Sequence, residues 1–457
     1  MHNLWKTSFE SIAGCPYPVF RQDLPYSSLF YAPGYLAVAR PQVADELAHQ
    51  LASPAPGLFA ARRLHEQAQA ALQRWEDTYR PRPFEPLCLT LYTSQRCNLA
   101  CSYCFSQGEP ATTDADLDLD YILEAAEEVA RHCRRAALPF SLVIHGGGEP
   151  TLDTRLADIL AAVGAVVDRH RLEHFYYLAT NGVMAEEQAR WVAQNFDEVG
   201  LSCDGPDAIQ AAQRPLKNGH SSTPLVEQTA AILRAAGKAL HVRATLTPQS
   251  LERMPEIAAY LCGQLHASQV RIEPVFQGGR THPDDCLPAQ QAERFCAAFL
   301  QARRIAAAYG ARWAFSGSRP GEIHGPYCQV FRDVLQLVPG NGVSACFKAG
   351  SRSQAHALGM DLERPAGGGY GIDPDRVEAL QASLAVDSAG CQACFNRFHC
   401  ARGCPDHCPA QPATHAGDLR CAVNRMLATA LLQERAAQLA PVLRQNPVVG
   451  SVIQGVL

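Results

Sequence analysis

The chain has 457 residues, more than one hydrophobic core usually supports, so we expect two or three domains. Hydrophobic residues make up 47% and charged residues 19%, which fits a globular protein and argues against extended disorder. The formal net charge is -5, without long acidic or basic blocks, so nothing indicates binding to nucleic acid or to a membrane. Small molecules or proteins are the expected partners.

The beginning of the chain lacks the basic stretch and apolar run of a secretory signal, and no apolar run is long enough to span a membrane. We therefore expect a cytoplasmic protein. Its 18 cysteines are then more often metal ligands or buried small side chains than disulfides. Three cysteines fall in helical patterns and are expected to be buried and inert: Cys133, Cys262 and Cys296.

Residues 1–86 form an amino-terminal α+β region. An extended stretch at 26–39 is followed by helical patterns at 41–51 and 62–79. One interpretation is a small module that recognises a peptide by adding a strand to a sheet. The alternative is a helical lid that packs on the next domain.

Strands and helices then alternate along the chain. The β-prone runs are 87–93, 139–145, 174–182, 197–206, 239–246 and 269–276. The helical patterns between them are 117–136, 151–170, 185–196, 225–236 and a segment from 254. This α/β order predicts a parallel sheet that curls into a partial (β/α)6 TIM-like barrel, in which chemistry belongs at the carboxyl ends of the strands.

Polar and cysteine motifs follow these strands at their carboxyl ends. In strand order they are Cys97, Cys101 and Cys104; Gly147, Gly148 and Glu149; Asn181; Ser202 and Asp204; Arg243; and Glu273. Three thiolates on one short loop are one ligand short of a closed structural zinc site, so they suit a metal centre with an open position. Asp204 and Glu273 are candidates for handling a proton, as catalytic residues, because they stand where a barrel mouth is expected.

The pattern CxxxCxxC after a first strand and GGE after a second resembles the radical S-adenosylmethionine enzymes, over residues 87–276. The resemblance implies that Cys97, Cys101 and Cys104 hold a [4Fe-4S] cluster whose open iron binds S-adenosylmethionine. It also implies the cofactor contacts: Tyr103 near the adenine, Gly147 and Gly148 beside the methionine end, Glu149 on its ammonium, Ser202 on ribose or carboxylate, and Arg243 on the carboxylate. Asn181 is either a further contact or a turn former in an Asn-Gly dipeptide.

A second cysteine pattern, CX2CX5CX3C, covers Cys391, Cys394, Cys400 and Cys404. Cys328 and Cys346 precede it, and Cys408 and Cys421 follow. His399 and His407 lie nearby, so a structural zinc site is one alternative. After a radical core, however, the pattern resembles the SPASM domains, which carry up to two auxiliary [4Fe-4S] clusters.

This second resemblance implies ligand sets that interleave along the chain. The second auxiliary cluster would take Cys391, Cys394, Cys400 and Cys421, whereas the first would take Cys328, Cys346 and Cys404. The sequence departs from the family pattern at the first cluster, because Gly340 and Gly342 stand either side of the expected glycine and no cysteine follows Cys328 closely. Either an iron stays open for substrate, or Cys408 completes the site.

We therefore predict four segments: 1–86, a radical barrel at 87–320, an auxiliary-cluster domain at 321–430, and a helical tail at 431–457. The predicted activity is cleavage of S-adenosylmethionine to a 5'-deoxyadenosyl radical that abstracts hydrogen from a residue of a ribosomally made peptide. The product would be cross-linked or oxidised, and the electron would come from a flavodoxin or ferredoxin. The alternatives are an anaerobic sulfatase maturase that makes formylglycine, an enzyme acting on a small molecule, and a zinc-stabilised binding protein without activity.

Overall fold

The computed structural model describes residues 9–106, 114–275, 279–317, 319, 321–323, 332–364, 370–384, 389–400, 419–445 and 453–456. Three cysteines assigned above as ligands or candidates lie outside these residues: Cys328, Cys404 and Cys408. His407 of the zinc alternative lies outside them as well. Within the described part of the chain, no helix is both long and apolar enough to cross a membrane.

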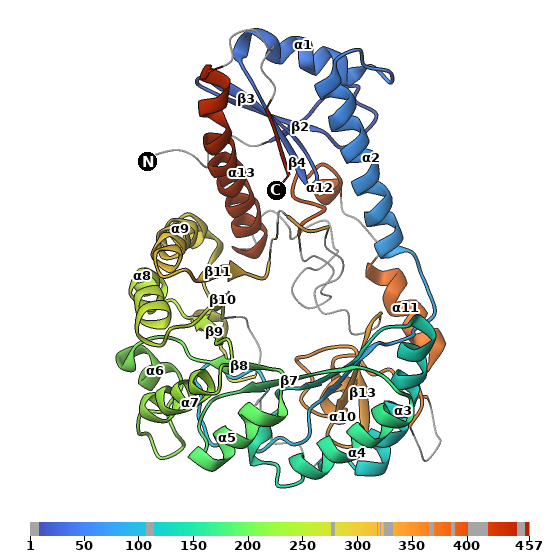
Figure 1. Ribbon diagram of the computed structural model, residues 1–457, viewed down its shortest axis with the longest axis vertical. Coiled ribbons are helices and arrows are strands. Elements are labelled where there is room, and N and C mark those ends of the chain that lie inside the picture. The colour runs from blue at the N-terminus through green and yellow to red at the C-terminus, as the bar shows by residue number, and fades with distance from the viewer. Residues whose placement is uncertain are drawn as a thin grey trace.

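A mostly parallel, curved sheet lies in the lower half of the view in Figure 1, with the strand order β11-β10-β9-β8-β7-β6-β5-β12-β13. The six predicted strands are all present: β5 (Cys88–Leu91), β6 (Phe140–Ile144), β7 (His174–Thr180), β8 (Glu198–Ser202), β9 (His241–Leu246) and β10 (Gln269–Pro274). They lie side by side in chain order, each parallel to the next. The prediction of an α/β fold with a partial TIM-like barrel is confirmed.

Helices cover the outer face of this curved sheet (Figure 1). They are α3 (Leu119–Ala136), α4 (Leu156–Arg169), α5 (Glu186–Asn195), α6 (Asp207–Gln213), α7 (Thr223–Ala235), α8 (Met254–Ala258) and α9 (Ala292–Ala308), with a π-helical turn at Ala259–Gln264. Their apolar faces meet one face of the strands in a continuous buried core. The alternate strand residues on the other face are partly exposed, which leaves a concave inner surface.

The sheet extends beyond the six predicted strands at both edges. β11 (Arg312–Phe315) pairs in parallel with β10, and β12 (Val334–Val338) pairs in parallel with β5. β13 (Gly342–Ser344) then pairs antiparallel with β12. The residue pattern of β12 cannot indicate that it pairs with β5, because β5 lies far away in the sequence. A segment that the sequence assigned to the auxiliary domain therefore supplies strands of the barrel sheet.

A second, antiparallel sheet is built from the amino-terminal region, in the order β1-β2-β3-β4-β14. Its strands are β1 (Glu10–Ser11), β2 (Phe20–Leu24), β3 (Ser27–Ala32), β4 (Tyr35–Ala39) and β14 (Ile453–Val456). The predicted extended stretch is the β3–β4 hairpin, and the two predicted helices are α1 (Pro41–Ala52) and α2 (Phe59–Tyr79). Both helices pack on one face of this sheet.

The other face of the amino-terminal sheet packs on the end of the chain (Figure 1). Helix α13 (Leu419–Gln445) buries Ala428, Leu432 and Ala436 against this face. The opposite side of α13 buries Val423 and Leu427 in the barrel core. The helix therefore joins the two sheets, and it runs across the boundary predicted between residues 430 and 431. The remaining helices are α10 (Arg352–Ala357), α11 (Pro374–Leu384) and α12 (Ala389–Gln392).

Candidate functional site

Three thiols meet on the loop that follows β5. Cys101 is 9% exposed, and it interacts electrostatically with both Cys97 and Cys104. Burial raises the pKa of the Cys101 thiol to about 11, and Arg214 lowers it in part. Among the described residues, no group of three or more cysteine, histidine or acidic side chains is arranged to hold one metal ion. The loop suits a cluster, in which each thiolate binds a different iron.

The cysteine loop is fixed by backbone hydrogen bonds to the segment after α6. The amide of Ala100 donates to the carbonyl of Pro215 at 2.9 Å, and the amide of Ser102 donates to the carbonyl of Gln213 at 3.0 Å. Leu99 and Leu216 form a β-bridge next to them. This short ladder sets the residue between Gln213 and Pro215, which is Arg214, opposite Cys101.

The glycines after β6 allow a second loop to approach the cysteine loop. The amide of Glu149 donates to the carbonyl of Arg96 at 2.6 Å. A Cβ atom at Gly148 would lie 2.1 Å from that carbonyl oxygen, and Gly147 has a φ of +92°. The structure therefore places both predicted glycines beside the cysteine loop, where larger side chains would hold the loops apart.

Glu149 is 2% exposed, and its carboxylate is held by its own chain. Its Oε1 accepts from the hydroxyls of Thr151 (2.8 Å) and Thr180 (2.7 Å), and its Oε2 accepts from the amide of Asn181 at 2.7 Å. Burial raises its pKa, although these hydrogen bonds favour the charged form. Oε2 keeps a lone pair for another donor, so the predicted contact with an ammonium group stays a prediction.

Asn181 forms a turn, which is one of the two roles that the sequence left open, whereas its contact with the cofactor stays a prediction. Its Oδ1 accepts from the amide of Val183 at 2.8 Å, which is an Asx-type turn. Its Nδ2 donates to Asn98 at 2.8 Å and lies 3.8 Å from the sulfur of Cys97. The residue therefore forms the turn and also contacts the cysteine loop.

Asp204 is completely buried in a hydrogen-bond network beneath the cysteine loop. Its Oδ2 accepts from the hydroxyl of Tyr103 at 2.6 Å and from Gln213 at 2.7 Å, and its Oδ1 accepts from the amide of Thr245 at 2.9 Å. Arg214 in turn donates to the hydroxyl of Tyr103 at 2.8 Å. The prediction that Asp204 handles a proton stays untested, but this arrangement favours a role in positioning Tyr103 and Arg214.

Sequence reasoning missed Gln213 and Arg214. They lie at the end of a short helix, with no motif around them that indicates a site. Only the pairing of this segment with the cysteine loop brings them to the centre, and that pairing is not visible in a local pattern.

The predicted polar residues of the later strands share the concave inner face. Ser202 on β8 is the register partner of Arg243 on β9, whose own partner on β10 is Arg271. Two residues further along these strands, towards their carboxyl ends, Glu273 of β10 is the register partner of Thr245 of β9. The Oε1 of Glu273 accepts from the amide of Ser316, and its Oε2 is buried without a hydrogen-bond partner. Sequence reasoning missed Arg271, which adds a second cation to this face.

His145, at the end of β6, is a neutral aromatic neighbour of this face. Its ring stacks on Tyr92 with centroids 5.7 Å apart, and its Nε2 lies 3.4 Å from Arg243. Burial and the charge of Arg243 lower the pKa of His145 to about 3. Its Nδ1 accepts from the amide of Gly146 at 2.7 Å, so in the neutral ring the proton is on Nε2 and the contact with Arg243 is not a hydrogen bond accepted by His145.

The second cysteine pattern begins on α12. Cys391 and Cys394 interact electrostatically, and the amide of Cys394 donates to the carbonyl of Cys391 at 3.1 Å. Further along this segment, the Cζ atom of Arg397 lies over the ring of Trp75 on α2, 4.1 Å from the ring centroid. Phe395 packs against Phe9 with centroids 4.9 Å apart. The amino-terminal region therefore packs directly on this cysteine segment.

One asparagine of α13 joins Cys400 to the helix that carries Cys421. The Nδ2 of Asn424 donates to the sulfur of Cys400 at 3.2 Å, and Asn424 is 2% exposed. Cys421 lies one helical turn before Asn424 and so shares its face of α13. Cys391, Cys394, Cys400 and Cys421 thus occupy neighbouring elements, but their joint ligation of a cluster stays a prediction.

Cys346, the described member of the other predicted set, follows β13. The next residue, Phe347, accepts from the hydroxyl of Tyr92 at 2.9 Å through its carbonyl. Gln95 donates to the carbonyl of Gly350 at 3.2 Å. The Cys346 segment therefore lies next to the first cysteine loop.

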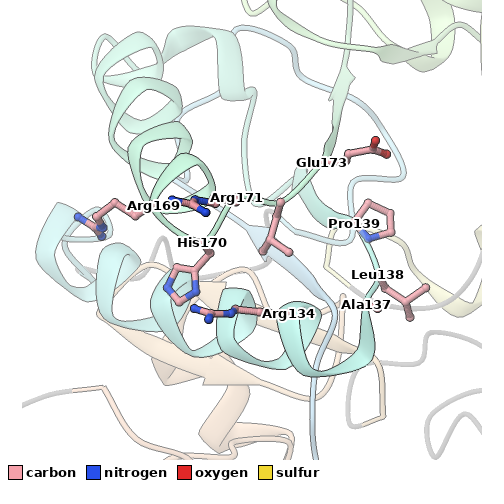
Figure 2. A pocket seen from close by; sticks show the side chains of 9 residues that line it. Arg134, Ala137, Leu138, Pro139, Arg169, His170, Arg171 and Glu173 are labelled. Carbon is pink, nitrogen blue, oxygen red and sulfur yellow. The ribbon is translucent and has the colours of Figure 1, made fainter.

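The cysteines expected to be inert are buried as predicted, with exposures of 0%, 3% and 0% for Cys133, Cys262 and Cys296. A pocket elsewhere is lined by Arg134, Arg169, His170, Arg171 and Glu173 (Figure 2). It lies where α3 and α4 end and β6 and β7 begin. This is the opposite end of the strands from the cysteine loop, so the pocket is separate from the site described above.

Comparison with known proteins adds independent findings. Residues 91–261 match the model of the radical SAM superfamily. A GTP 3',8-cyclase of Stenotrophomonas maltophilia is 29% identical over 180 residues, which are 38% of this chain and 51% of that protein. A pre-heme d1 synthase of Dinoroseobacter shibae is 29% identical over 194 residues, which are 41% and 43% of the two chains. The matches thus span about half or less of these relatives.

Solved structures share the fold over more of the chain. The structure of native anSMEcpe with bound AdoMet superposes with a TM-score of 0.59 and 18% identity, covering 78% of this chain and 100% of that one. The same protein with bound AdoMet and the Cp18Cys peptide gives a TM-score of 0.56 and 17% identity, covering 78% and 99%. At these identities the likeness concerns the fold.

Proposed function

We propose, from the match of residues 91–261 to the radical SAM superfamily, that the chain is a radical S-adenosylmethionine maturase acting on a ribosomally made peptide. In this proposal it generates a 5'-deoxyadenosyl radical, abstracts hydrogen from one residue, and releases a cross-linked or oxidised peptide. The observation that carries the proposal is the meeting of three thiols, Cys97, Cys101 and Cys104, on one loop at the carboxyl ends of the strands.

The donor set fits a four-iron cluster with one open iron. Three thiols, with no fourth cysteine among the described residues of the loop, match that requirement, and the metal would favour their deprotonated form. When bound, such a cluster supplies the electron that cleaves S-adenosylmethionine.

The chain's own residues would orient the bound S-adenosylmethionine. The free lone pair of Glu149 Oε2 would accept from its ammonium group, and Arg243 beside Ser202 would bind its carboxylate. Tyr103, fixed by Asp204 and Arg214, would pack near its adenine. Glu273, whose Oε2 has no hydrogen-bond partner, is the better placed of the two predicted residues to take a proton from substrate.

The peptide substrate is supported by the fold shared with a protein that was crystallised with the Cp18Cys peptide. An extended peptide could add a strand at an edge of the amino-terminal antiparallel sheet, whose edge strands are β1 and β14. The electron would come from a flavodoxin or ferredoxin in the cytoplasm. Action on a sulfatase side chain, to give formylglycine, is the second candidate, since it needs the same cofactor site.

The second cysteine region would hold two auxiliary [4Fe-4S] clusters, as the resemblance to SPASM domains implies. Cys391, Cys394, Cys400 and Cys421 would ligate one of them. The other would take Cys346 together with Cys328 and Cys404, and Cys408 would either complete it or leave an iron open for substrate. The proximity of Cys346 to the first cysteine loop supports a path for electrons between the two regions.

Anaerobic reconstitution with iron and sulfide tests the proposal. We expect labile sulfide, an iron content above that of one cluster, and reductive cleavage of S-adenosylmethionine to 5'-deoxyadenosine. Mass spectrometry of a peptide encoded next to this chain, co-expressed with it, should then show a loss of hydrogen. Zinc without labile sulfide would overturn the proposal and favour the zinc-stabilised binding protein.

A further inference from the structure

One arginine next to the first cysteine loop has so far only the role of fixing Tyr103 through a hydrogen bond to its hydroxyl. Arg214 is 8% exposed, and a guanidinium is rarely buried to that extent unless it is paired. Its Nη1 donates to the hydroxyl of Tyr103, whereas its Nε is buried and has no hydrogen-bond partner. The structure therefore holds a fixed positive charge and one unused donor in the interior.

The position of Arg214 is set by the ladder between two loops. The amides on either side of Cys101 donate to the carbonyls on either side of Arg214. This direct opposition explains why Arg214 interacts electrostatically with Cys101 and also with Cys97. The charge is thus aimed at the thiols rather than at solvent.

Asp204, the acidic residue near Arg214, does not form a direct ion pair with its guanidinium. Asp204 interacts with Arg214 electrostatically. Its carboxylate oxygens, however, accept hydrogen bonds from Tyr103, Gln213 and the amide of Thr245. Tyr103 lies between the two groups, so no direct hydrogen bond joins the guanidinium to the carboxylate among the contacts of the described residues. The network holds Arg214 in place without neutralising it at short range.

Three thiolates bring three negative charges into this interior, and reduction of a bound cluster adds one more. The net charge around a cluster and the hydrogen bonds to its sulfur atoms are main determinants of its reduction potential. We propose that Arg214 is the buried counter-charge of the cluster held by Cys97, Cys101 and Cys104, and that it raises the reduction potential of that cluster. This inference rests on the proposed function of the cysteine loop.

The test is a redox titration of the reconstituted full-length protein. The signal to follow is the electron paramagnetic resonance spectrum that changes when S-adenosylmethionine is added, because it reports the open cluster. In Arg214→Gln we expect the ratio of reduced to oxidised cluster, at a fixed ambient potential, to fall about tenfold, which corresponds to ~59 mV for a one-electron couple. Arg214→Lys keeps the charge and should stay close to the unsubstituted protein.

Arg253→Gln is the matched control, since it removes the same charge from a surface pair with Glu256. It should leave the titration unchanged. Asp204→Asn changes the opposite partner: it removes the negative charge near Arg214, so the reduced fraction should rise. This opposite sign shows whether the potential responds to charge at this place even if Arg214→Gln does not fold, as judged by circular dichroism.

An unchanged potential in Arg214→Gln, or an equal fall in Arg214→Lys, would overturn the role of the charge while the proposed function stands. An unchanged or lowered reduced fraction in Asp204→Asn would overturn it too. A failure of the proposed function looks different, because the unsubstituted protein would then show no signal that responds to S-adenosylmethionine.

Discussion

The two cysteine regions are built in different ways. The first takes all its thiols from one loop after β5, and neighbouring loops of the same sheet brace it through Glu149 and Arg214. The second takes its thiols from α12, the following loop and α13, and it packs against the amino-terminal sheet through Phe395. A local region can assemble with its own barrel, whereas a composite region depends on parts that are distant in sequence.

The largest expected effect comes from removing one thiol from each region, which tests whether the two regions hold separate clusters. In Cys101→Ala, cleavage of S-adenosylmethionine should fall to background while most iron of the second region remains, because separate loops build separate centres. In Cys400→Ala, cleavage should persist and part of the iron should be lost. Iron analysis and chromatography of 5'-deoxyadenosine measure both. Continued cleavage in Cys101→Ala would show that the first region is wrongly assigned.

The dependence of the second region on the amino-terminal sheet gives the next largest effect. Phe395→Ala removes a buried ring between the sheet and the cysteine segment and should cost about 3–5 kcal/mol of the free energy of unfolding. The iron of the second region should fall with it. Leu51→Ala is the control, since Leu51 is buried on the other face of that sheet, away from the cysteines. Equal iron loss in both variants would mean that the sheet acts only through overall stability.

Each region also has an asparagine that points its amide at a thiol, at different distances. Asn424 lies 3.2 Å from the sulfur of Cys400, whereas Asn181 lies 3.8 Å from that of Cys97. Removing a hydrogen bond of this kind costs about 1 kcal/mol, or roughly fivefold in an equilibrium. Asn424→Ala should therefore lower the potential of the second region by more than Asn181→Ala lowers that of the first. Redox titration of both variants checks the order, and the reverse order would contradict it.

The smallest predicted effect concerns pH and the first region. The pKa of His145 is about 3 in the folded chain, against an ordinary value of 6.5. Between pH 6.5 and pH 3 the imidazole of His145 is protonated in the unfolded chain but neutral in the folded chain. The free energy of unfolding therefore decreases as the pH falls through this range. Urea unfolding of the metal-free protein should show a weaker pH dependence in His145→Gln, by about 1.4 kcal/mol between neutral pH and pH 5.5. Parallel curves for the two proteins would refute the assignment.

The sequence predicted what local patterns encode. The six barrel strands, the helices between them, the thiols of the first loop and Glu149 all follow from periodicity and short motifs. It could not predict β12 as a barrel strand or Arg214 as a neighbour of Cys101, because both depend on pairing between segments far apart in the chain. Asn424 was invisible for the same reason, since a single asparagine in a helical pattern carries no signal until its helix is docked.

The amino-terminal sheet has a consequence for the order of synthesis. Its hairpin of β3 and β4 leaves the ribosome before any barrel strand, yet α13 and β14, which cover and extend it, are made after the whole barrel. Most of the barrel can therefore fold during translation, although Val423 and Leu427 of α13 complete its core later, while the earliest sheet waits for late partners on both of its exposed sides. Iron delivered to the second cysteine region would then have to arrive after translation has passed α13, whereas the first loop could be loaded earlier.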